Sequence, residues 1–334
     1  SDGGAVITAL NVERDMLGAW KKRSGYETYL GTPDNSQVAT LFDWTRNDGT
    51  SLNTYRFSGS QLYYSAQGTA AWAVAGNGTM SGGSHVGHAV LDDQMIIGDG
   101  VNASKHTTNG TSFTDTSGAP LAEHWVDYQG RVWGARGTAV AGTNTDLFFS
   151  TVGTLTDWTT DSSSVRIPGP GRVNTVIKAP ALSSIMAAKD SGNMFAYNQF
   201  QLFDMSTDLG PSSPYSVGTS EGVAIYLSRE GACMFLGKTP DLISDPIRRQ
   251  IYNDAGEGIV GTVFGNAPGV IHRDYWLCGV GTVTDNLTDR TVADCILKYD
   301  ISLDEWSNWK FANRPYSFHS FTDASGSQQL IFGD

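Results

Sequence analysis

The stretch WVDYQGRVWGAR at residues 125–136 consists of two short, apolar-rich segments joined by the pair Gln129-Gly130. Alternation with a period of two predicts a β-strand on each side, and the Gln-Gly pair suits the positive φ angles of a two-residue hairpin turn. Five other stretches repeat this pattern of strand, polar turn and strand: AVLDDQMIIGDG (89–100), MAAKDSGNMFAY (186–197), IYLSREGACMFLG (225–237), VIHRDYWLCGVG (270–281) and SFTDASGSQQLIFGD (320–334). We therefore predict an all-β chain of successive hairpins.

The hairpins recur with a period of roughly 35 to 50 residues. A second half-motif follows some of them, in which a strand and a turn lead to a returning tryptophan, at Trp72, Trp158 and Trp309. A repeat of this length built from four short strands is typical of a β-propeller, whose neighbouring blades bury one another's faces. We expect the three tryptophans to pack between blades rather than to bind a ligand.

The chain length of 334 residues corresponds to about seven blades of four strands, with six or eight also open. The sequence ends with LIFGD at residues 330–334, in the middle of a predicted blade. We therefore predict that the N-terminal segment Ala5 to Val12 supplies a strand that closes the last blade. The predicted organisation is an N-terminal arm with the closing strand at residues 1–37, followed by the propeller at 38–334.

Composition agrees with a β-rich fold and limits the function. Gly, Ser and Thr are abundant, and charged residues make up 17% of the chain. Helical periodicity is confined to Glu13–Lys22 and Asp241–Asn253. The net charge is 22 − 34 = −12 and is spread evenly over both halves, so there is no basic domain to grip nucleic acid, and no apolar run is long enough for a membrane span.

Metal and disulfide chemistry is not predicted. His85 and His88 are close in sequence but have no nearby third ligand, and the cysteines lack the spacing of a zinc site or a disulfide framework. The cysteines, which we interpret as small buried apolar residues, are Cys233, Cys278 and Cys295. Calcium could use the fragments 47–50 (NDGT) and 99–102 (DGVN), but neither is a full calcium-binding loop.

The enzyme alternative is a propeller glycosidase, in which carboxylates from several blades meet near the axis. The candidates are Asp99, Asp127, Asp190 and Asp274, and each also stands in a turn where Asp is expected for backbone reasons. The Ser-x-Asp-x-Gly-x-Thr-Trp turn of sialidases occurs in no repeat. We therefore assign no catalytic, cofactor-binding or metal-binding residue, and a carbohydrate-active propeller (glycoside hydrolase or lectin) at a cell surface stays open as the alternative.

Several stretches, taken in order, resemble the β-propeller structural proteins of tailed bacteriophages, a group that includes packaged-DNA stabilisation (head-completion) proteins and tail-tube or nozzle proteins. They are GGAVITALN (3–11), KRSGYE (22–27), LYY (62–64), IIGDGVN (96–102), RVWGA (131–135), LFFS (147–150) with LTDW (155–158), and IRRQI (247–251). The resemblance implies a non-enzymatic virion protein of the neck or tail, without a cofactor. It also implies a homo-oligomeric ring, for which we expect sixfold symmetry, in contact with other neck or tail proteins.

Packaged DNA would pass near such a ring without specific binding. An acidic protein repels the duplex, so that DNA can slide past it rather than adhere to it. The acidic composition is compatible with a part of a DNA conduit in the virion, and it also occurs in many proteins with other roles.

Overall fold

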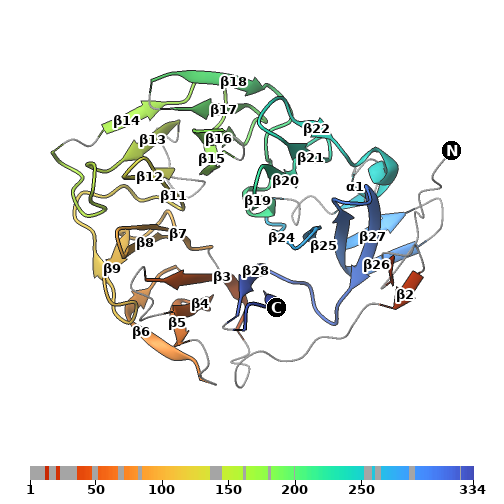
Figure 1. Cartoon of the computed structure of the whole chain (residues 1–334), viewed down its shortest axis with the longest axis horizontal. Helices are drawn as coiled ribbons and strands as arrows, with labels where there is room; N and C mark the ends of the chain where they lie inside the picture. Colours follow the sequence, from red (N-terminus) through yellow and green to blue (C-terminus); the bar gives the residue numbers. More distant parts are fainter. Residues whose placement is uncertain are drawn as a thin grey trace.

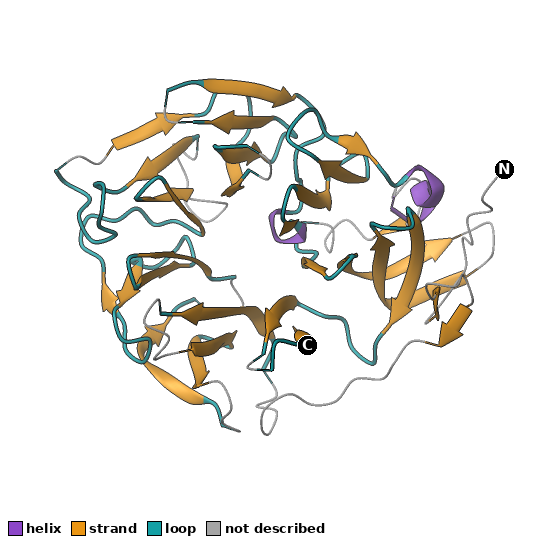
Figure 2. Cartoon of the chain, viewed as in Figure 1, coloured by secondary structure: helices purple, strands orange, loops and turns teal. Residues whose placement is uncertain are grey.

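The computed structural model of the chain describes residues 12–14, 20–22, 36–46, 52–66, 71–81, 85–135, 145–160, 163–179, 182–198, 200–251, 258–259, 265–285, 290–323 and 325–334. In these residues strands dominate (Figure 2), and helical structure is limited to the short 3-10 helices η1 (Pro214–Ser216) and η2 (Asp245–Ile247) and one turn of α-helix, α1 (Arg248–Ile251). The all-β prediction is confirmed. None of the described helices has the length and apolar character needed to cross a membrane.

The strands form small antiparallel sheets that stand around a central axis, as the blades of a propeller do (Figure 1). Blade 1 comprises β3 (Val38–Thr45), β4 (Leu52–Ser58), β5 (Gln61–Ala66) and β6 (Ala73–Thr79); blade 2 comprises β7 (Gly87–Leu91), β8 (Gln94–Gly98), β9 (Lys105–Thr107) and β10 (Thr114–Asp115); blade 3 comprises β11 (His124–Tyr128), β12 (Arg131–Ala135), β13 (Asp146–Phe149) and β14 (Ser163–Arg166). Blade 4 comprises β15 (Val173–Lys178), β16 (Ile185–Lys189), β17 (Met194–Tyr197) and β18 (Leu202–Ser206); blade 5 comprises β19 (Gly218–Ser220), β20 (Val223–Leu227), β21 (Ala232–Phe235) and β22 (Asp241–Leu242).

The sixth blade is larger and is followed by a hairpin. It comprises β24 (Gly269–His272), β25 (Tyr275–Asp285), β26 (Arg290–Asp300) and β27 (Glu305–Lys310), with β23 (Gly258–Ile259) paired to the far half of β25. The hairpin of β28 (Ser317–Thr322) and β29 (Gln328–Gly333) lies between blade 6 and blade 1. The β-propeller prediction is confirmed, and six blades of four or more strands is one of the counts that the sequence leaves open.

All innermost strands begin on the same face of the disc. Each blade starts with its inner strand and returns in antiparallel steps, so after four strands the chain is back on the face from which it started. In order around the axis the inner strands are β3, β7, β11, β15, β19, β24 and β28, and β28 contacts β3 to complete the circle. We call the face on which these strands begin the start face.

The hydrophobic core is divided into clusters that lie between neighbouring blades. Trp44 and Ile97 belong to the cluster between blades 1 and 2, and Trp133 and Val176 belong to the one between blades 3 and 4. Each pair of consecutive blades shares such a cluster, and the last one joins blade 6 to β28 through Phe318. Because burial of one large apolar side chain contributes about 1.5–3 kcal/mol and a hydrogen bond contributes about 1 kcal/mol, these clusters dominate the cohesion between blades.

The hairpin turns have the backbone geometry that their sequences predict. Asp92 and Asp93 between β7 and β8 both have positive φ angles, of 47° and 59°, and so do Gln129 (49°) and Gly130 (69°) between β11 and β12. Two consecutive positive φ angles are the mark of a type I′ turn, whose twist matches that of the flanking strands. The local turn signal therefore sets the registers of these hairpins, which pair Leu91 with Gln94 and Tyr128 with Arg131.

The helix expected at Glu13–Lys22 is not found in the described residues of that segment, and the one expected at Asp241–Asn253 is confirmed in part. Val12–Arg14 (β1) and Trp20–Lys22 (β2) within the first segment form a two-stranded antiparallel hairpin. In the second segment, the short strand β22 at Asp241–Leu242 comes first and helix covers Asp245–Ile251; residues 252 and 253 lie outside the described residues. Apolar spacing over so few residues fits either structure, and pairing with a neighbouring strand decided the outcome.

The tryptophans of the half-motif have different environments. Trp158 is buried between blades 2 and 3, with its ring edge-on to Trp125 at an interplanar angle of 71°, and Trp309 is buried between blade 6 and β28. Trp72 is partly exposed, and the guanidinium of Arg56 lies 4.8 Å from the centre of its ring. The inter-blade prediction is therefore confirmed for the first two and not for Trp72.

The ring closes where the C-terminus meets β3. The amide of Val38 donates to the carbonyl of Asp334 (3.3 Å), and the hydroxyl of Ser317 donates to the carbonyl of Val38 (2.8 Å). Of the predicted closing strand Ala5 to Val12, residues 5–11 lie outside the described residues. Val12 belongs to β1, where it pairs with Lys22 of β2.

Candidate functional site

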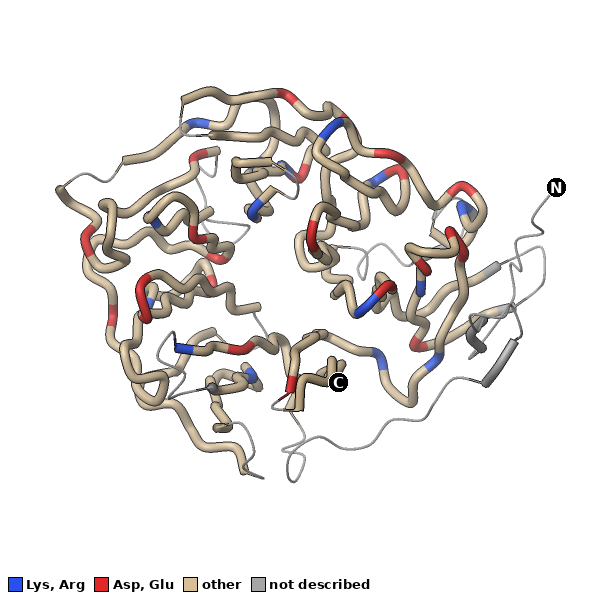
Figure 3. The backbone as a smooth tube through the Cα atoms, in the orientation of Figure 1, with Lys and Arg blue, Asp and Glu red and all other residues tan. Residues whose placement is uncertain are grey.

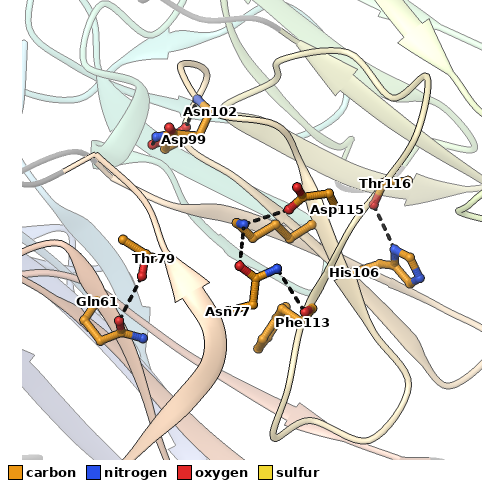
Figure 4. Close-up of polar contacts among 10 residues, drawn as sticks. Gln61, Asn77, Thr79, Asp99, Asn102, His106, Phe113, Asp115 and Thr116 are labelled. Carbon is orange, nitrogen blue, oxygen red and sulfur yellow. Dashed lines mark hydrogen bonds and ion pairs between the residues drawn. The ribbon is translucent and has the colours of Figure 1, made fainter.

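The carboxylate of Asp99, the first of the predicted carboxylates, accepts hydrogen bonds from the turn in which it stands (Figure 4). Its Oδ1 accepts hydrogen bonds from the amides of Val101 and Asn102, at 2.9 and 2.8 Å. Its Oδ2 accepts from the amide of Ser81 and the side chain of Asn102, at 2.8 and 2.7 Å. Burial raises the pKa of Asp99, but these hydrogen bonds outweigh burial and hold the pKa below its usual value. With four donors around it, this carboxylate is not placed to hold calcium or to transfer a proton.

A second polar network in the same blade is also structural (Figure 4). The ammonium group of the buried Lys105 lies 2.8 Å from the carboxylate of Asp115 and 3.2 Å from the side-chain oxygen of Asn77. Asn77 in turn donates to the carbonyl of Phe113 (3.2 Å). The network ties β6 of blade 1 to the outer strands of blade 2.

The other three carboxylates do not meet. Asp127 lies on the inner strand β11 and pairs with Lys178 of β15 (2.7 Å). Asp190 follows β16, the second strand of its blade, and accepts from the amide and the Nε of Arg172 (2.9 and 3.2 Å). Asp274 is exposed in the turn between β24 and β25. Of the four predicted carboxylates, Asp127 alone stands on an inner strand.

The two neighbouring histidines face different partners. His85 precedes β7 and stacks on Tyr215, whereas His88 within β7 stacks on Phe42 of blade 1, with ring centres 4.1 Å apart. In the described part of the chain, no group of three His, Cys, Asp or Glu side chains is arranged to hold a metal ion. His85 and His88 therefore act separately.

All three cysteines are buried, free thiols. Burial raises the pKa of Cys233 to about 11, and it raises the pKa of Cys278 still further. A thiol with a raised pKa is a poor nucleophile at neutral pH, in keeping with the interpretation of these residues as small apolar side chains.

Polar side chains join neighbouring inner strands around much of the axis, and we call them the inner belt. Its members are Asp43 (β3), His88 (β7), Asp127 (β11), Lys178 (β15), His272 (β24), and His319 and Ser320 (β28). His319 Nε2 lies 3.1 Å from Asp43 Oδ2, and His272 Nδ1 shares a hydrogen bond of 2.9 Å with Ser320 Oγ. Each of these contacts links the inner strands of two successive sheets.

Successive side chains of β28 point alternately toward blade 1 and toward blade 6, so this one strand contacts both neighbouring sheets. Ser317, His319 and Phe321 point toward blade 1, where Ser317 and His319 contact Val38 and Asp43. Phe318 and Ser320 point toward blade 6, where they join its apolar cluster and His272. Successive side chains of a strand point to opposite faces, so β28 presents one set of residues to each neighbour.

Three aromatic side chains meet at the start face, and we call them the axial cluster: His85, His124 and Tyr215. His85 and Tyr215 stack with ring centres 3.5 Å apart and an interplanar angle of 19°, and His124 lies 5.8 Å from Tyr215. Arg314, just before β28, donates from Nη2 to the carbonyl of Asn266 (3.3 Å).

The contact between His85 and Tyr215 crosses the axis. Tyr215 belongs to η1, directly before β19, and His85 lies directly before β7. Two inner strands, β11 and β15, separate β7 from β19 on one side, and three, β24, β28 and β3, separate them on the other. The two rings therefore reach each other from opposite sides of the disc, over its axial end.

The imidazoles at the axis are held neutral. Burial lowers the pKa of His85 to about 3, with further contributions from the nearby charges of His124 and Arg314. Burial likewise lowers the pKa of His88 and of His124 to about 4 each. At neutral pH these rings pack as uncharged aromatic groups.

Acidic and basic positions are interspersed around the described part of the disc (Figure 3), in agreement with the even distribution of charge along the sequence.

Comparisons with known proteins support the fold of this chain and do not identify its family. No protein-family model and no curated protein matches the sequence. Among solved structures, the chain is similar to the extracellular domain of the putative one component system BT4673 from B. thetaiotaomicron, with 11% identity over 96% of this chain and 44% of that chain, and a TM-score of 0.54. It is also similar to the computationally designed Ika8 protein, with 10% identity over 98% of this chain and all of that chain, and a TM-score of 0.49. At such identities the likeness is one of fold.

Proposed function

We propose that this propeller is a non-enzymatic building part of the virion of a tailed bacteriophage, located at the neck or tail, where copies form a ring that helps to close the head or to conduct DNA. The phage assignment rests on the ordered sequence resemblance at residues 3–11, 22–27, 62–64, 96–102, 131–135, 147–150, 155–158 and 247–251. The absence of catalytic chemistry from the proposal rests on the geometry at the axis.

One observation supports the structural role most directly: the polar groups of the inner strands are used to join blades. Asp127 pairs with Lys178, Asp43 with His319, and His272 with Ser320. A hydrolase of this fold needs two carboxylates near its axis that are free to exchange protons and to face a substrate. Here the inner-strand carboxylates Asp43 and Asp127 both have cationic or imidazole partners from a neighbouring sheet.

The contact of His85 with Tyr215 adds to the same argument. In a propeller that binds a sugar ring on its axis, we expect aromatic side chains around the axis to be separated so that the sugar can stack between them. These two rings stack on each other at 3.5 Å instead. A carbohydrate-active protein at a cell surface is the second candidate, and it would require this contact to open.

The proposal is tested by the mass and symmetry of the native assembly. We expect electron microscopy of the purified full chain, alone or with its neighbouring virion proteins, to show closed rings with sixfold symmetry. Glycan hydrolysis and glycan-array binding are measured in parallel on the same preparation, and we expect neither. A monomer that cleaves or binds a glycan would overturn the proposal in favour of the carbohydrate-active alternative.

A further inference from the structure

The outer edge of blade 4 carries two exposed phenylalanines. Phe200, in the turn between β17 and β18, is 88% exposed, and Phe203 within β18 is 44% exposed. The turn is ordered, because the side-chain oxygen of Asn198 accepts hydrogen bonds from the amides of Phe200 and Gln201, at 3.1 and 2.9 Å. Two large aromatic side chains held outward on one outer strand are typical of a contact surface, and we call Phe200 and Phe203 the blade 4 edge surface.

The outer edge of blade 1 carries the apolar run Ala71–Val74. Trp72 is partly exposed and the other three residues are exposed, with Val74 at 61%. A run of four apolar residues that all reach the surface does not fit the alternation of a half-buried strand and is typical of a binding site. From Gly76 onward β6 is hydrogen-bonded to residues 111–113 of blade 2, so this surface is confined to residues 71–74, and we call it the blade 1 edge surface.

The two edge surfaces are bordered by opposite charges. The guanidinium of Arg56 lies 4.8 Å from the centre of the Trp72 ring at blade 1. At blade 4, Asp204 follows Phe203 directly, Asp208 lies just after β18, and both are exposed. A contact between unlike edges brings the guanidinium toward these carboxylates. A contact between two blade 4 edges would instead bring carboxylates together, and one between two blade 1 edges would bring guanidinium groups together.

The edge surfaces point away from each other on the disc (Figure 1). Blades 2 and 3 separate blade 1 from blade 4 on one side, and blades 5 and 6 with the β28–β29 hairpin separate them on the other. One copy can therefore contact two neighbours at once, through different surfaces. Contacts of this head-to-tail kind produce a ring when the rotation between copies closes.

We propose that copies of this chain join side by side, with the blade 4 edge surface of one copy seated on the blade 1 edge surface of the next. The two phenylalanines alone expose on the order of 250 Å² of surface. That is roughly half of the apolar area, about 450 Å², that one side of a standard interface buries. The contact rests on the ring of the proposed function and assigns the residues that would build it.

Single substitutions on each edge test the contact in the full chain. Phe203→Glu and Val74→Glu each place a carboxylate in the apolar contact, and each is expected to weaken self-association by at least about thirtyfold in sedimentation velocity over a concentration series. Leu303→Glu is the matched control, since Leu303 is 45% exposed in the turn between β26 and β27 of blade 6, and it should leave association unchanged. If Val74→Glu does not fold, Ala73→Glu replaces it.

Mixing the two variants tests the head-to-tail arrangement. Phe203→Glu keeps an intact blade 1 edge, and Val74→Glu keeps an intact blade 4 edge. We expect each variant alone to be monomeric and an equimolar mixture to form a dimer of one copy of each, with nothing larger, because only one intact contact is available to the pair.

The other outcomes overturn the contact. Undiminished association of Val74→Glu would show that blade 4 edges pair with each other, and undiminished association of Phe203→Glu would show the same for blade 1 edges. A monomeric wild-type chain that binds phosphatidylcholine vesicles, with binding lost in Phe203→Glu, would assign the phenylalanines to a membrane surface. A wild-type chain that neither associates nor binds vesicles would also overturn the contact. Rings that persist in both variants would overturn this contact and leave the proposed ring standing.

Discussion

The seam between blades 5 and 6 and the seam that closes the ring between β28–β29 and blade 1 are built differently. The first is apolar, with Ile225, Leu227 and Trp276 fully buried in one cluster. The second relies on hydrogen bonds, from the hydroxyl of Ser317 to the carbonyl of Val38 and from the amide of Val38 to the carbonyl of Asp334. Apolar contacts tolerate small shifts, whereas hydrogen bonds depend on distance and angle, so the closing seam fixes geometry more than it adds stability.

The largest effect is expected from the apolar seam. Trp276 is fully buried, stands at right angles to Trp306, and donates from its indole N–H to the carbonyl of Ser216 (3.1 Å). Trp276→Ala is expected to lower the free energy of unfolding by about 3–5 kcal/mol, because it leaves a cavity and an unpaired carbonyl. Urea denaturation at pH 7 measures the change.

The exposed Val152 provides the control for this prediction. Val152→Ala, at a residue that is 55% exposed, should change the free energy of unfolding by less than about 0.5 kcal/mol. A loss of under about 1 kcal/mol in Trp276→Ala would mean that the apolar seam is not the main source of cohesion.

The closing seam can be forced apart by one methyl group. A Cβ atom at Gly333 would lie 2.4 Å from the Cβ of Val38, closer than carbon atoms approach each other. Gly333→Ala is expected to cost about 1–3 kcal/mol of stability and to increase hydrogen exchange in β28 and β29. Gly265→Ala, where the added carbon meets nothing within 4 Å, is the matched control.

A double-mutant cycle with Val38→Gly sharpens this prediction. If the clash is between these two residues, Val38→Gly should recover part of the loss caused by Gly333→Ala. Strictly additive effects would place the damage elsewhere.

Acid is expected to weaken the inner belt more than the apolar seams. The pKa of His88 is lowered from 6.5 to about 4, mainly by burial, with the neighbouring His319 acting in the same direction and Asp43 and Asp127 acting against it. Between these two pKa values the unfolded chain binds more protons than the folded one, so stability falls as the pH falls, by up to about 1.4 kcal/mol per pH unit for this histidine. Above pH 6.5 its contribution is fully present.

Urea denaturation at pH 7, 6 and 5 measures this slope. His88→Gln should make the slope shallower by up to about 1.4 kcal/mol per unit, whatever its effect on stability at pH 7. An unchanged slope would show that His88 does not titrate in this range.

The smallest expected effect is the loss of one hydrogen bond, and it can be compared between the closing seam and the seam of blades 5 and 6. Ser317 donates to the carbonyl of Val38 at the closing seam, and the buried Ser213 donates to the carbonyl of Ala267 (3.1 Å) at the seam of blades 5 and 6. Each Ser→Ala substitution should cost about 1 kcal/mol in urea denaturation. Only Ser317→Ala should also speed hydrogen exchange in β28 and β29, and equal exchange in both variants would contradict the distinction between the seams.

The fold was predictable because its signals are local. The pairs Asp92-Asp93 and Gln129-Gly130 indicate their turns within a few residues, and the alternating segments beside them, within 89–100 and 125–136, become β7, β8, β11 and β12. The helix prediction at Glu13–Lys22 failed because short apolar spacing does not reveal a strand partner. The long strand β25 extends past residue 281, where the predicted repeat stretch ends, because its polar end pairs with β26 and this pairing decides its extent.

The axial cluster could not be predicted in the same way. His85 was singled out for its closeness to His88, yet its partner is Tyr215, which lies far along the chain in a different blade. Asp127 was a candidate for its position in an inner hairpin, but Lys178 had no signal to link it with that position. Contacts between blades depend on how the ring closes, and a single sequence has no local pattern that records them.

The stacking of His85 on Tyr215 has a consequence for the proposed conduit. Because His85 and Tyr215 contact each other across the axis of the propeller, a DNA duplex cannot pass along the axis of a single subunit. In a ring of copies, the propellers would lie side by side around a central channel, and their outer surfaces would line that channel. The residues that contact DNA would then lie on the outer edge or on one face of the disc, and residues at the axis would not contact DNA.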